Sequence, residues 1–124
     1  MAKMTEHPQR GQIWQVALDP VIGHEIGKTR PALVISNNIN NQFADTVTLI
    51  PVTSKTSKIY PFEVFISKSD SGLAADSKIK CNQVRTVDKS RLIRLTTNVS
   101  QEIIEKVEEA LLIHLGITIK ALTP

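Results

Sequence analysis

The chain of 124 residues carries 15 lysines and arginines against 12 aspartates and glutamates, and 41% of its residues are hydrophobic. This length suits one domain and this apolar content suffices for a packed core, which excludes a mainly disordered chain. A single cysteine, Cys81, excludes an intramolecular disulfide and a cysteine-based zinc cluster.

Most of the predicted elements are short β-strands, taken here in chain order. Valine, isoleucine and threonine supply 36 residues, and such β-branched side chains fit a pleated sheet. Pro51 suggests that its strand has an edge, an end or a bulge there. The β-rich segments are Gln12–Leu18, Pro31–Ile35, Val47–Ser54, Phe62–Ile66, Ser77–Val87 and Arg91–Thr97. The loops or turns expected between them are Asp19–Thr29, Asn37–Asp45, Lys55–Pro61, Lys68–Gly72 and Asp88–Ser90.

The hydrophobic period changes from strand-like to helical after Ser100, which is a plausible helix N-cap. Gly116 can end the helix, and His114 is expected near its inner edge as a partly buried structural residue. We therefore predict a mainly β fold with a C-terminal helix, a small β-barrel or sandwich. One domain would span residues 1–124, with a core over about 10–116 and a short arm over 1–9. The apolar positions at helical spacing are Ile103, Ile104, Val107, Leu111 and Leu115.

The charges are unevenly distributed along the chain. The first 99 residues hold 13 basic and 8 acidic residues, whereas the remainder holds two lysines and four glutamates. The basic part would attract an anionic partner, although a mildly basic protein with one acidic helix explains the charge equally well. The N-terminal residues lack the apolar core of a secretory signal, and no apolar run is long enough to cross a membrane. We expect a soluble cytoplasmic protein without a membrane partner.

Several enzyme classes are poorly supported by the motifs. The three histidines, at positions 7, 24 and 114, are far apart and lie in no zinc-site spacing. There is no GxSxG turn of a serine hydrolase and no glycine-rich phosphate loop. We therefore expect no metal site and no cofactor.

Polar and basic residues near the strand ends remain as candidates for an anion-binding site. Each has an ordinary alternative, because an arginine or threonine at a strand end is often only a surface residue. With five aromatic residues in the chain, an open base-stacking platform is not expected. If RNA binds, lysine and arginine would hold its backbone, and asparagine and glutamine would read its bases. The candidates are His24, Glu25, Lys28, Arg30, Thr53, Ser54, Lys80, Asn82, Gln83 and Arg85.

Four blocks in the same order give the chain a specific resemblance to the MazF/PemK family of toxin ribonucleases. They are RGQIWQVALDPVIGHEIGKTRPALVIS, VTLIPVTS, YPFEV and CNQVRTVDKSRL, and the resemblance runs from Arg10 to about Leu115. It implies a small SH3-like barrel with a C-terminal helix, paired as a homodimer. It also implies a toxin that cuts single-stranded RNA, mainly mRNA, at short sequences without a metal, and that a cognate antitoxin blocks.

The resemblance places the catalytic arginine of the family at Arg30 and its catalytic threonine at Thr53. His24 matches a loop histidine proposed as a helper in PemK-like members. The chain departs from some relatives at Asn82, where they carry an acidic residue proposed as general base, and at Lys80, where they carry an arginine. Since an amide cannot act as that base, the role does not transfer. The expected RNA contacts are Glu25, Lys28, Ser54, Lys80, Asn82, Gln83 and Arg85.

Two other functions remain open. The same fold resembles toxins that bind and poison DNA gyrase without cutting RNA, which would need a protein-binding surface near the C-terminal helix and not Arg30. An inactive RNA-binding relative is the second alternative, with Asn82 as a sign of lost activity. Cleavage of RNA would exclude both alternatives.

Overall fold

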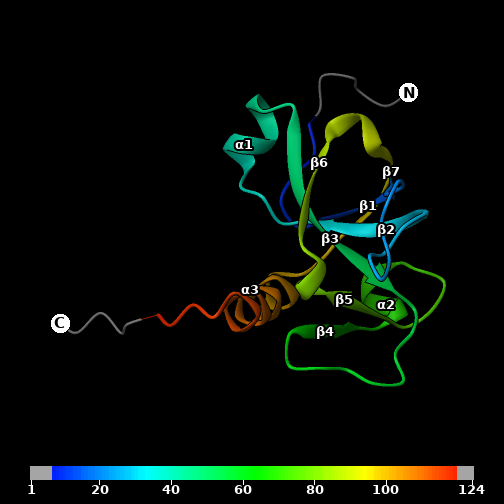
Figure 1. The fold of residues 1–124 in the computed structure, drawn as a ribbon, viewed down its shortest axis with the longest axis vertical. Coiled ribbons are helices and arrows are strands. Elements are labelled where there is room, and N and C mark those ends of the chain that lie inside the picture. The colour runs from blue at the N-terminus through cyan, green and yellow to red at the C-terminus, as the bar shows by residue number, and fades with distance from the viewer. Residues whose placement is uncertain (1–6, 120–124) are drawn as a thin grey trace.

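The computed structural model describes residues 7–119, within which seven strands form one antiparallel sheet (Figure 1). The strand order is β4-β5-β3-β2-β1-β7, and β6 pairs with β3 off this path. The sheet curves into an open, barrel-like shape, so the predicted mainly β fold with a C-terminal helix is confirmed. The strands are β1 (Gln12–Ala17), β2 (Thr29–Val34), β3 (Thr46–Thr53), β4 (Glu63–Ile66), β5 (Ser77–Lys80), β6 (Arg85–Asp88) and β7 (Leu92–Asn98).

Two segments predicted as turns contain short helices instead, α1 (Asn38–Phe43) and α2 (Lys68–Ser71). Each begins with a side-chain cap: Asn37 accepts a hydrogen bond from the N–H of Asn40, and Ser67 accepts one from the N–H of Asp70. Such caps make a single helical turn and a polar turn hard to separate by composition, because both favour the same residues. Two short 3-10 helices, η1 (Cys81–Gln83) and η2 (Lys89–Arg91), follow β5 and β6, respectively.

Strand β3 is the central element, and it changes partner along its length. Its first half pairs with β6, and its last two residues pair with β5. In the chain, η1 lies between β5 and β6. Pro51 lies between the two ladders, where the missing N–H of proline costs no hydrogen bond on that side. An edge strand at Pro51 is wrong because β3 is central, but the pairing on the β5–β6 side is interrupted at Pro51. The predicted segment Ser77–Val87 contains two strands rather than one.

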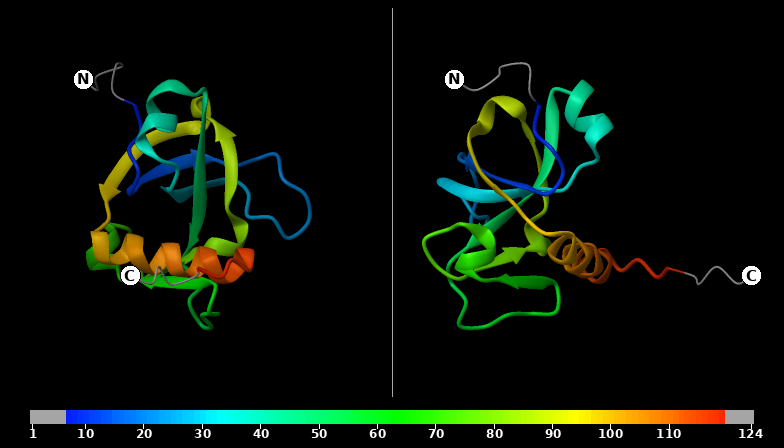
Figure 2. Two further views of the ribbon diagram at one scale, coloured as in Figure 1. Left: turned by 90° about the vertical axis from the view of Figure 1, so that its left-hand side faces the viewer. Right: turned by 180° about the vertical axis from the view of Figure 1, so that it is seen from behind.

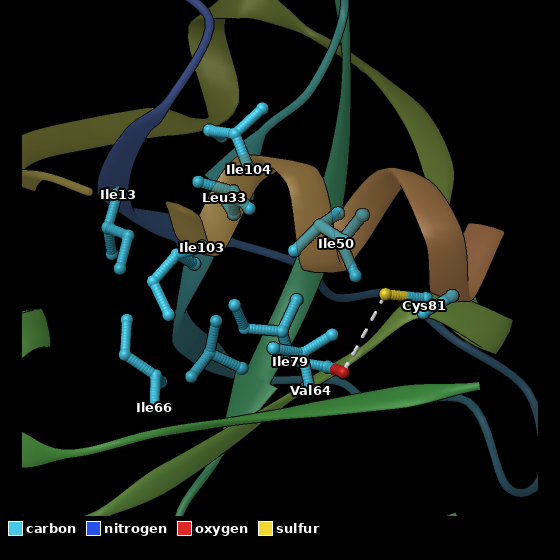
Figure 3. Packing of buried hydrophobic residues seen from close by; sticks show 12 residues of the cluster. Ile13, Leu33, Ile50, Val64, Ile66, Ile79, Cys81, Ile103 and Ile104 are labelled. Atoms are coloured by element: carbon cyan, nitrogen blue, oxygen red, sulfur yellow. Dashed lines mark hydrogen bonds between the residues drawn. The ribbon is translucent and has the colours of Figure 1, made fainter. Parts of the chain in front are cut away.

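Two clusters of buried side chains form the core. The larger cluster fills the space between α3 (Gln101–Leu115) and the sheet, and it includes Ile50, Ile79 and Ile104 (Figure 3). The smaller cluster, with Val16, Leu18 and Ala32 among its members, draws its side chains from β1 and the residue after it and from β2, β3 and β6. Apart from Cys81, the buried members of both clusters are aliphatic.

Helix α3 begins and ends where the sequence predicts. Ser100 is the N-cap and Gly116, with a φ of 67°, is the C-cap. Leu115 is 56% exposed and His114 is also exposed, so their predicted burial is wrong. Ile113 is exposed as well, so the other residues of the range 7–119 leave the last turn of α3 largely uncovered. No helix within residues 7–119 has the length and apolarity of a membrane span.

Replacing Ser100 with alanine is expected to lower the free energy of unfolding by about 1 kcal/mol. The hydroxyl of Ser100 accepts a hydrogen bond from the N–H of Ile103 at 3.3 Å, and alanine leaves that N–H without this partner. Urea unfolding followed by circular dichroism measures the change. Ser100→Asp serves as the control, because aspartate can make the same cap and should retain most of the stability. Equal stability of the alanine variant would show that the cap does not stabilise α3.

Candidate active site

The loop between β1 and β2, residues 18–28, projects from the body of the protein (Figure 2, left). The N–H of Leu18 donates to the carbonyl of Lys28 at 2.8 Å, which closes the neck of this β1–β2 loop. Gly27 lies against Asp19: a Cβ at position 27 would come within 2.3 Å of an oxygen of the Asp19 carboxylate. The loop thus has a defined shape, and it carries His24, Glu25 and Lys28 exposed on its surface.

Two predicted RNA-binding side chains hold the backbone of this loop. The side-chain oxygen of Gln83 accepts a hydrogen bond from the N–H of Ile26 at 2.7 Å, and its nitrogen donates to the carbonyl of His24 at 3.3 Å. One terminal nitrogen of Arg85 donates to the carbonyl of Leu18 at 3.1 Å. These contacts use one donor and one acceptor site of the Gln83 amide, so Gln83 holds the loop.

Arg30 lies on β2 opposite Val16 of β1, and its side chain is half-buried. Its Nε donates to the carbonyl of Gly27 at 3.2 Å, which fixes the direction of the guanidinium group. Neither of its terminal nitrogens has a hydrogen-bond or ion-pair partner within the described part of the chain. Arg30 therefore presents an oriented fork of free donors, the geometry that binds phosphate oxygens in pairs.

Thr53 ends β3 on the neighbouring strand. The β2–β3 pairing ends at Ala32 and Pro51, and Arg30 and Thr53 each lie two residues beyond this last pair on neighbouring strands. The hydroxyl oxygen of Thr53 accepts the N–H of Lys55 at 3.3 Å, which leaves its proton free for donation. Arg30 and Thr53 thus lie near the same end of the β2–β3 pair.

Most of the other candidates line one of two pockets. A pocket of about 530 Å³ is lined by His24, Glu25, Asn82, Gln83, Val84 and Arg85. A second pocket, of about 270 Å³, lies between Arg30 and Ser54 on one side and the segment 73–77 on the other. Neither pocket is lined by Lys28, Thr53 or Lys80. His24 therefore lines the same pocket as Asn82 and Gln83, and not the pocket that Arg30 lines.

Lys80 belongs to a buried ion cluster that the sequence did not reveal. Its ammonium lies 3.0 Å from one carboxylate oxygen of Glu63, and the ammonium of Lys78 lies 2.9 Å from the other. Burial raises the pKa of Glu63, but hydrogen bonds from the N–H of Tyr60 and from the two lysines outweigh this effect and hold the pKa below its usual range. Lys78 also donates to the carbonyl of Lys58 at 2.7 Å. The cluster attaches the β3–β4 loop, residues 54–62, to strand β5.

No metal-binding or nucleophilic centre accompanies these residues. Within residues 7–119, no group of three or more histidine, cysteine, aspartate or glutamate side chains is placed to hold a metal ion. Cys81 is buried and donates to the carbonyl of Ile79 (Figure 3). Burial, with a smaller contribution from the charge of Glu63, raises the pKa of Cys81 to about 12, so its thiol stays protonated and unreactive near neutral pH.

Residues 9–115 match the family described as PemK-like, MazF-like toxin of type II toxin-antitoxin system. The chain belongs to this toxin family. The matched range includes every candidate site residue, and the resemblance seen in the sequence is thereby confirmed.

Individual relatives and a solved structure agree with the family assignment. The chain is 40% identical over 114 residues to endoribonuclease MazF9 of Mycobacterium tuberculosis, covering 88% of this chain and 97% of the relative. It is 39% identical over 110 residues to endoribonuclease EndoA of Bacillus subtilis, covering 88% and 95%. A mycobacterial endoribonuclease solved in complex with its cognate antitoxin superposes with a TM-score of 0.73 at 25% identity, covering 91% of this chain and 99% of that one.

Proposed function

We propose that this chain is the toxin of a type II toxin–antitoxin pair and acts as a metal-independent endoribonuclease on single-stranded RNA, mainly mRNA. The observation that carries the proposal is the guanidinium group of Arg30, which the carbonyl of Gly27 orients and whose terminal nitrogens have no partner within residues 7–119. The endoribonuclease names of the two relatives that are about 40% identical support the same activity. Cutting messages would stop growth until the antitoxin blocks the site.

The reaction needs positioning and charge stabilisation more than a protein nucleophile. The 2′-hydroxyl of the RNA attacks its adjacent phosphorus and loses its proton, while the bond to the 5′-oxygen breaks and that oxygen gains a proton. The products are a 2′,3′-cyclic phosphate and a 5′-hydroxyl. Arg30 would donate to the phosphoryl oxygens as negative charge develops on them, and Thr53 would hold another oxygen. Arginine binds this charge well because its guanidinium stays protonated.

His24 is proposed as an acid–base helper of lower rank than Arg30. Its imidazole is exposed on the β1–β2 loop and can donate or accept a proton through its ring nitrogens. An RNA strand lying across both pockets would bring the His24 side of the loop and the Arg30 side into contact with neighbouring nucleotides. Asn82 would read a base rather than move a proton, because its side-chain oxygen is a buried acceptor with no hydrogen-bond partner among the described residues.

The remaining expected RNA contacts have unequal support. Glu25 lines the larger pocket with Asn82, and Ser54 lines the smaller one with Arg30. Lys28 is exposed on the loop and would meet the RNA backbone, whereas the ammonium of Lys80 is held by Glu63. We further propose that the chain acts as a cytoplasmic homodimer, in which loops from both copies would border one RNA path.

The test of the proposed function uses purified protein, EDTA and a mixed-sequence single-stranded RNA, with the product ends mapped. The expected result is cleavage at recurring short sites that leaves 2′,3′-cyclic phosphate and 5′-hydroxyl ends. Cleavage that requires a divalent ion, or that leaves 5′-phosphates, would contradict the proposed mechanism. Intact RNA across many substrates would overturn the activity, and inhibition of DNA gyrase would then favour the non-enzymatic alternative.

A further inference from the structure

Two arginines bind three consecutive carbonyl groups where the β1–β2 loop begins. One terminal nitrogen of Arg91 donates to the carbonyl of Ala17 at 3.0 Å and also to the carbonyl of Asp19. Arg85 donates to the carbonyl of Leu18, between them, at 3.1 Å. We call this set of contacts the arginine clamp. Arg91 belongs to η2, outside every site residue named so far.

The clamp acts where the sheet no longer holds β1. The pairing of β1 with β7 ends at Val16, and the pairing of β1 with β2 ends at Ala17. The carbonyls of Leu18 and Asp19 lie beyond both ladders, and Leu18 is buried, where a backbone carbonyl without a partner would be costly. Hydrogen bonds from a charged guanidinium are among the stronger ones in proteins. The two arginines therefore hold the backbone in place where strand β1 ends and the loop begins.

The direction of the loop is linked to the proposed catalytic arginine. Gln83 holds the returning half of the loop at Ile26, and Arg30 is itself bound through Nε to the carbonyl of Gly27. A change at the loop entry can thus alter both the position of Gly27 and the direction of the Arg30 guanidinium group. We propose that Arg91, together with Arg85, is a positioning residue that orients the β1–β2 loop and, through it, Arg30. The effect on catalysis rests on the proposed function, whereas the effect on the loop does not.

A comparison with Arg94 distinguishes a positioning role of Arg91 from direct contact with RNA. Arg94 lies on β7, three residues beyond Arg91, and it is exposed with no hydrogen-bond or salt-bridge partner within residues 7–119. Arg91 is half-buried, and its donors face the protein. If Arg91 were a phosphate contact, its removal would reduce the salt dependence of RNA binding by about one ion. A positioning residue should leave that dependence unchanged.

The experiment compares full-length Arg91→Ala, Arg91→Lys and Arg94→Ala with the wild type. Hydrogen exchange without RNA should be about tenfold faster in Arg91→Ala at the amides of Leu18 and Ile26, the effect of losing about one charge-assisted hydrogen bond. Arg94→Ala should exchange like the wild type at both amides. With RNA, Arg91→Ala should reduce kcat by about tenfold, again the loss of about one such bond, while the salt dependence of binding stays unchanged.

Unchanged exchange in Arg91→Ala, or a salt dependence lowered by about one ion, would overturn the inference. Should Arg91→Ala fail to fold, Arg91→Lys decides, because lysine keeps the charge but carries its nitrogen on a flexible stem instead of a rigid, planar guanidinium group. Faster exchange at Leu18 in that variant supports the clamp, and wild-type exchange overturns it. If even the wild type cuts no RNA, the proposed function fails, while the exchange data still test the clamp.

Discussion

Replacing Arg30 with alanine is expected to lower the rate of RNA cleavage by about 10²-fold or more, the usual effect of removing one donor to a developing oxyanion. The guanidinium group is fixed by the carbonyl of Gly27, and its terminal nitrogens are free within the described residues. Alanine removes both the charge and the paired donors. A single-turnover cleavage assay at saturating protein measures the chemical step separately from RNA binding.

Arg94→Ala is the matched control for this experiment, since it removes the same charge from an exposed position without removing a contact among the described residues. Arg30→Lys tests the geometry, because an ammonium carries the charge but cannot bind two phosphate oxygens as a planar fork. We expect the lysine variant to remain strongly impaired and the thermal unfolding of all three variants to match the wild type. Full activity of folded Arg30→Ala would exclude Arg30 from the reaction.

Much of the fold follows from local patterns in the sequence. Ser100, Gly116 and the apolar positions between them predict α3 because caps and helical spacing act over one or two turns. The charged residues before the strand Pro31–Ile35 predict that Arg30 stands at a strand entrance, which the structure places one residue inside β2. Such features depend on neighbours in the chain, so the sequence alone can show them.

The sequence alone did not show features that depend on residues far apart in the chain. Glu63 lies in the predicted strand Phe62–Ile66, and it is only 6% exposed because Lys78 and Lys80 from β5 neutralise it. The basic residues near Gln83 suggested RNA contacts, but Gln83 and Arg85 meet the backbone of a loop more than 55 residues away in sequence. Only the folded chain shows whether a polar side chain is free for a ligand or already bound to the protein.

The ion cluster around Glu63 leads to the largest expected effect on stability. Glu63→Gln should lower the free energy of unfolding at neutral pH by about 3 kcal/mol, because it leaves two poorly exposed ammonium groups without their counter-charge. The side chain of Glu63 is fully buried, and those of Lys78 and Lys80 are 9% and 20% exposed. Glutamine can still accept the N–H of Tyr60, so the charge is the main difference. Urea unfolding at pH 7 measures the loss.

Two further variants test the cause of this loss. Glu105→Gln removes the same charge from an exposed position on α3 and should change stability by no more than about 0.5 kcal/mol. Adding Lys78→Met to Glu63→Gln replaces one unpaired ammonium with an apolar side chain, and it should recover at least about 1 kcal/mol. A Glu63→Gln variant as stable as the wild type would mean that the cluster contributes nothing net to folding.

The same cluster predicts how the effect of Glu63→Gln depends on pH. The pKa of Glu63 is lowered in the folded protein, so its carboxylate stabilises the fold fully at pH values above the ordinary glutamate pKa of about 4.3. As the pH falls through the lower pKa of the folded state, Glu63 becomes protonated and this contribution is lost. The stability difference between the wild type and Glu63→Gln should therefore be constant from pH 6 to 7 and shrink in more acidic solution. A difference that grows on acidification would show that Glu63 is held neutral in the fold, and would reverse the assignment of the cluster as an ion pair.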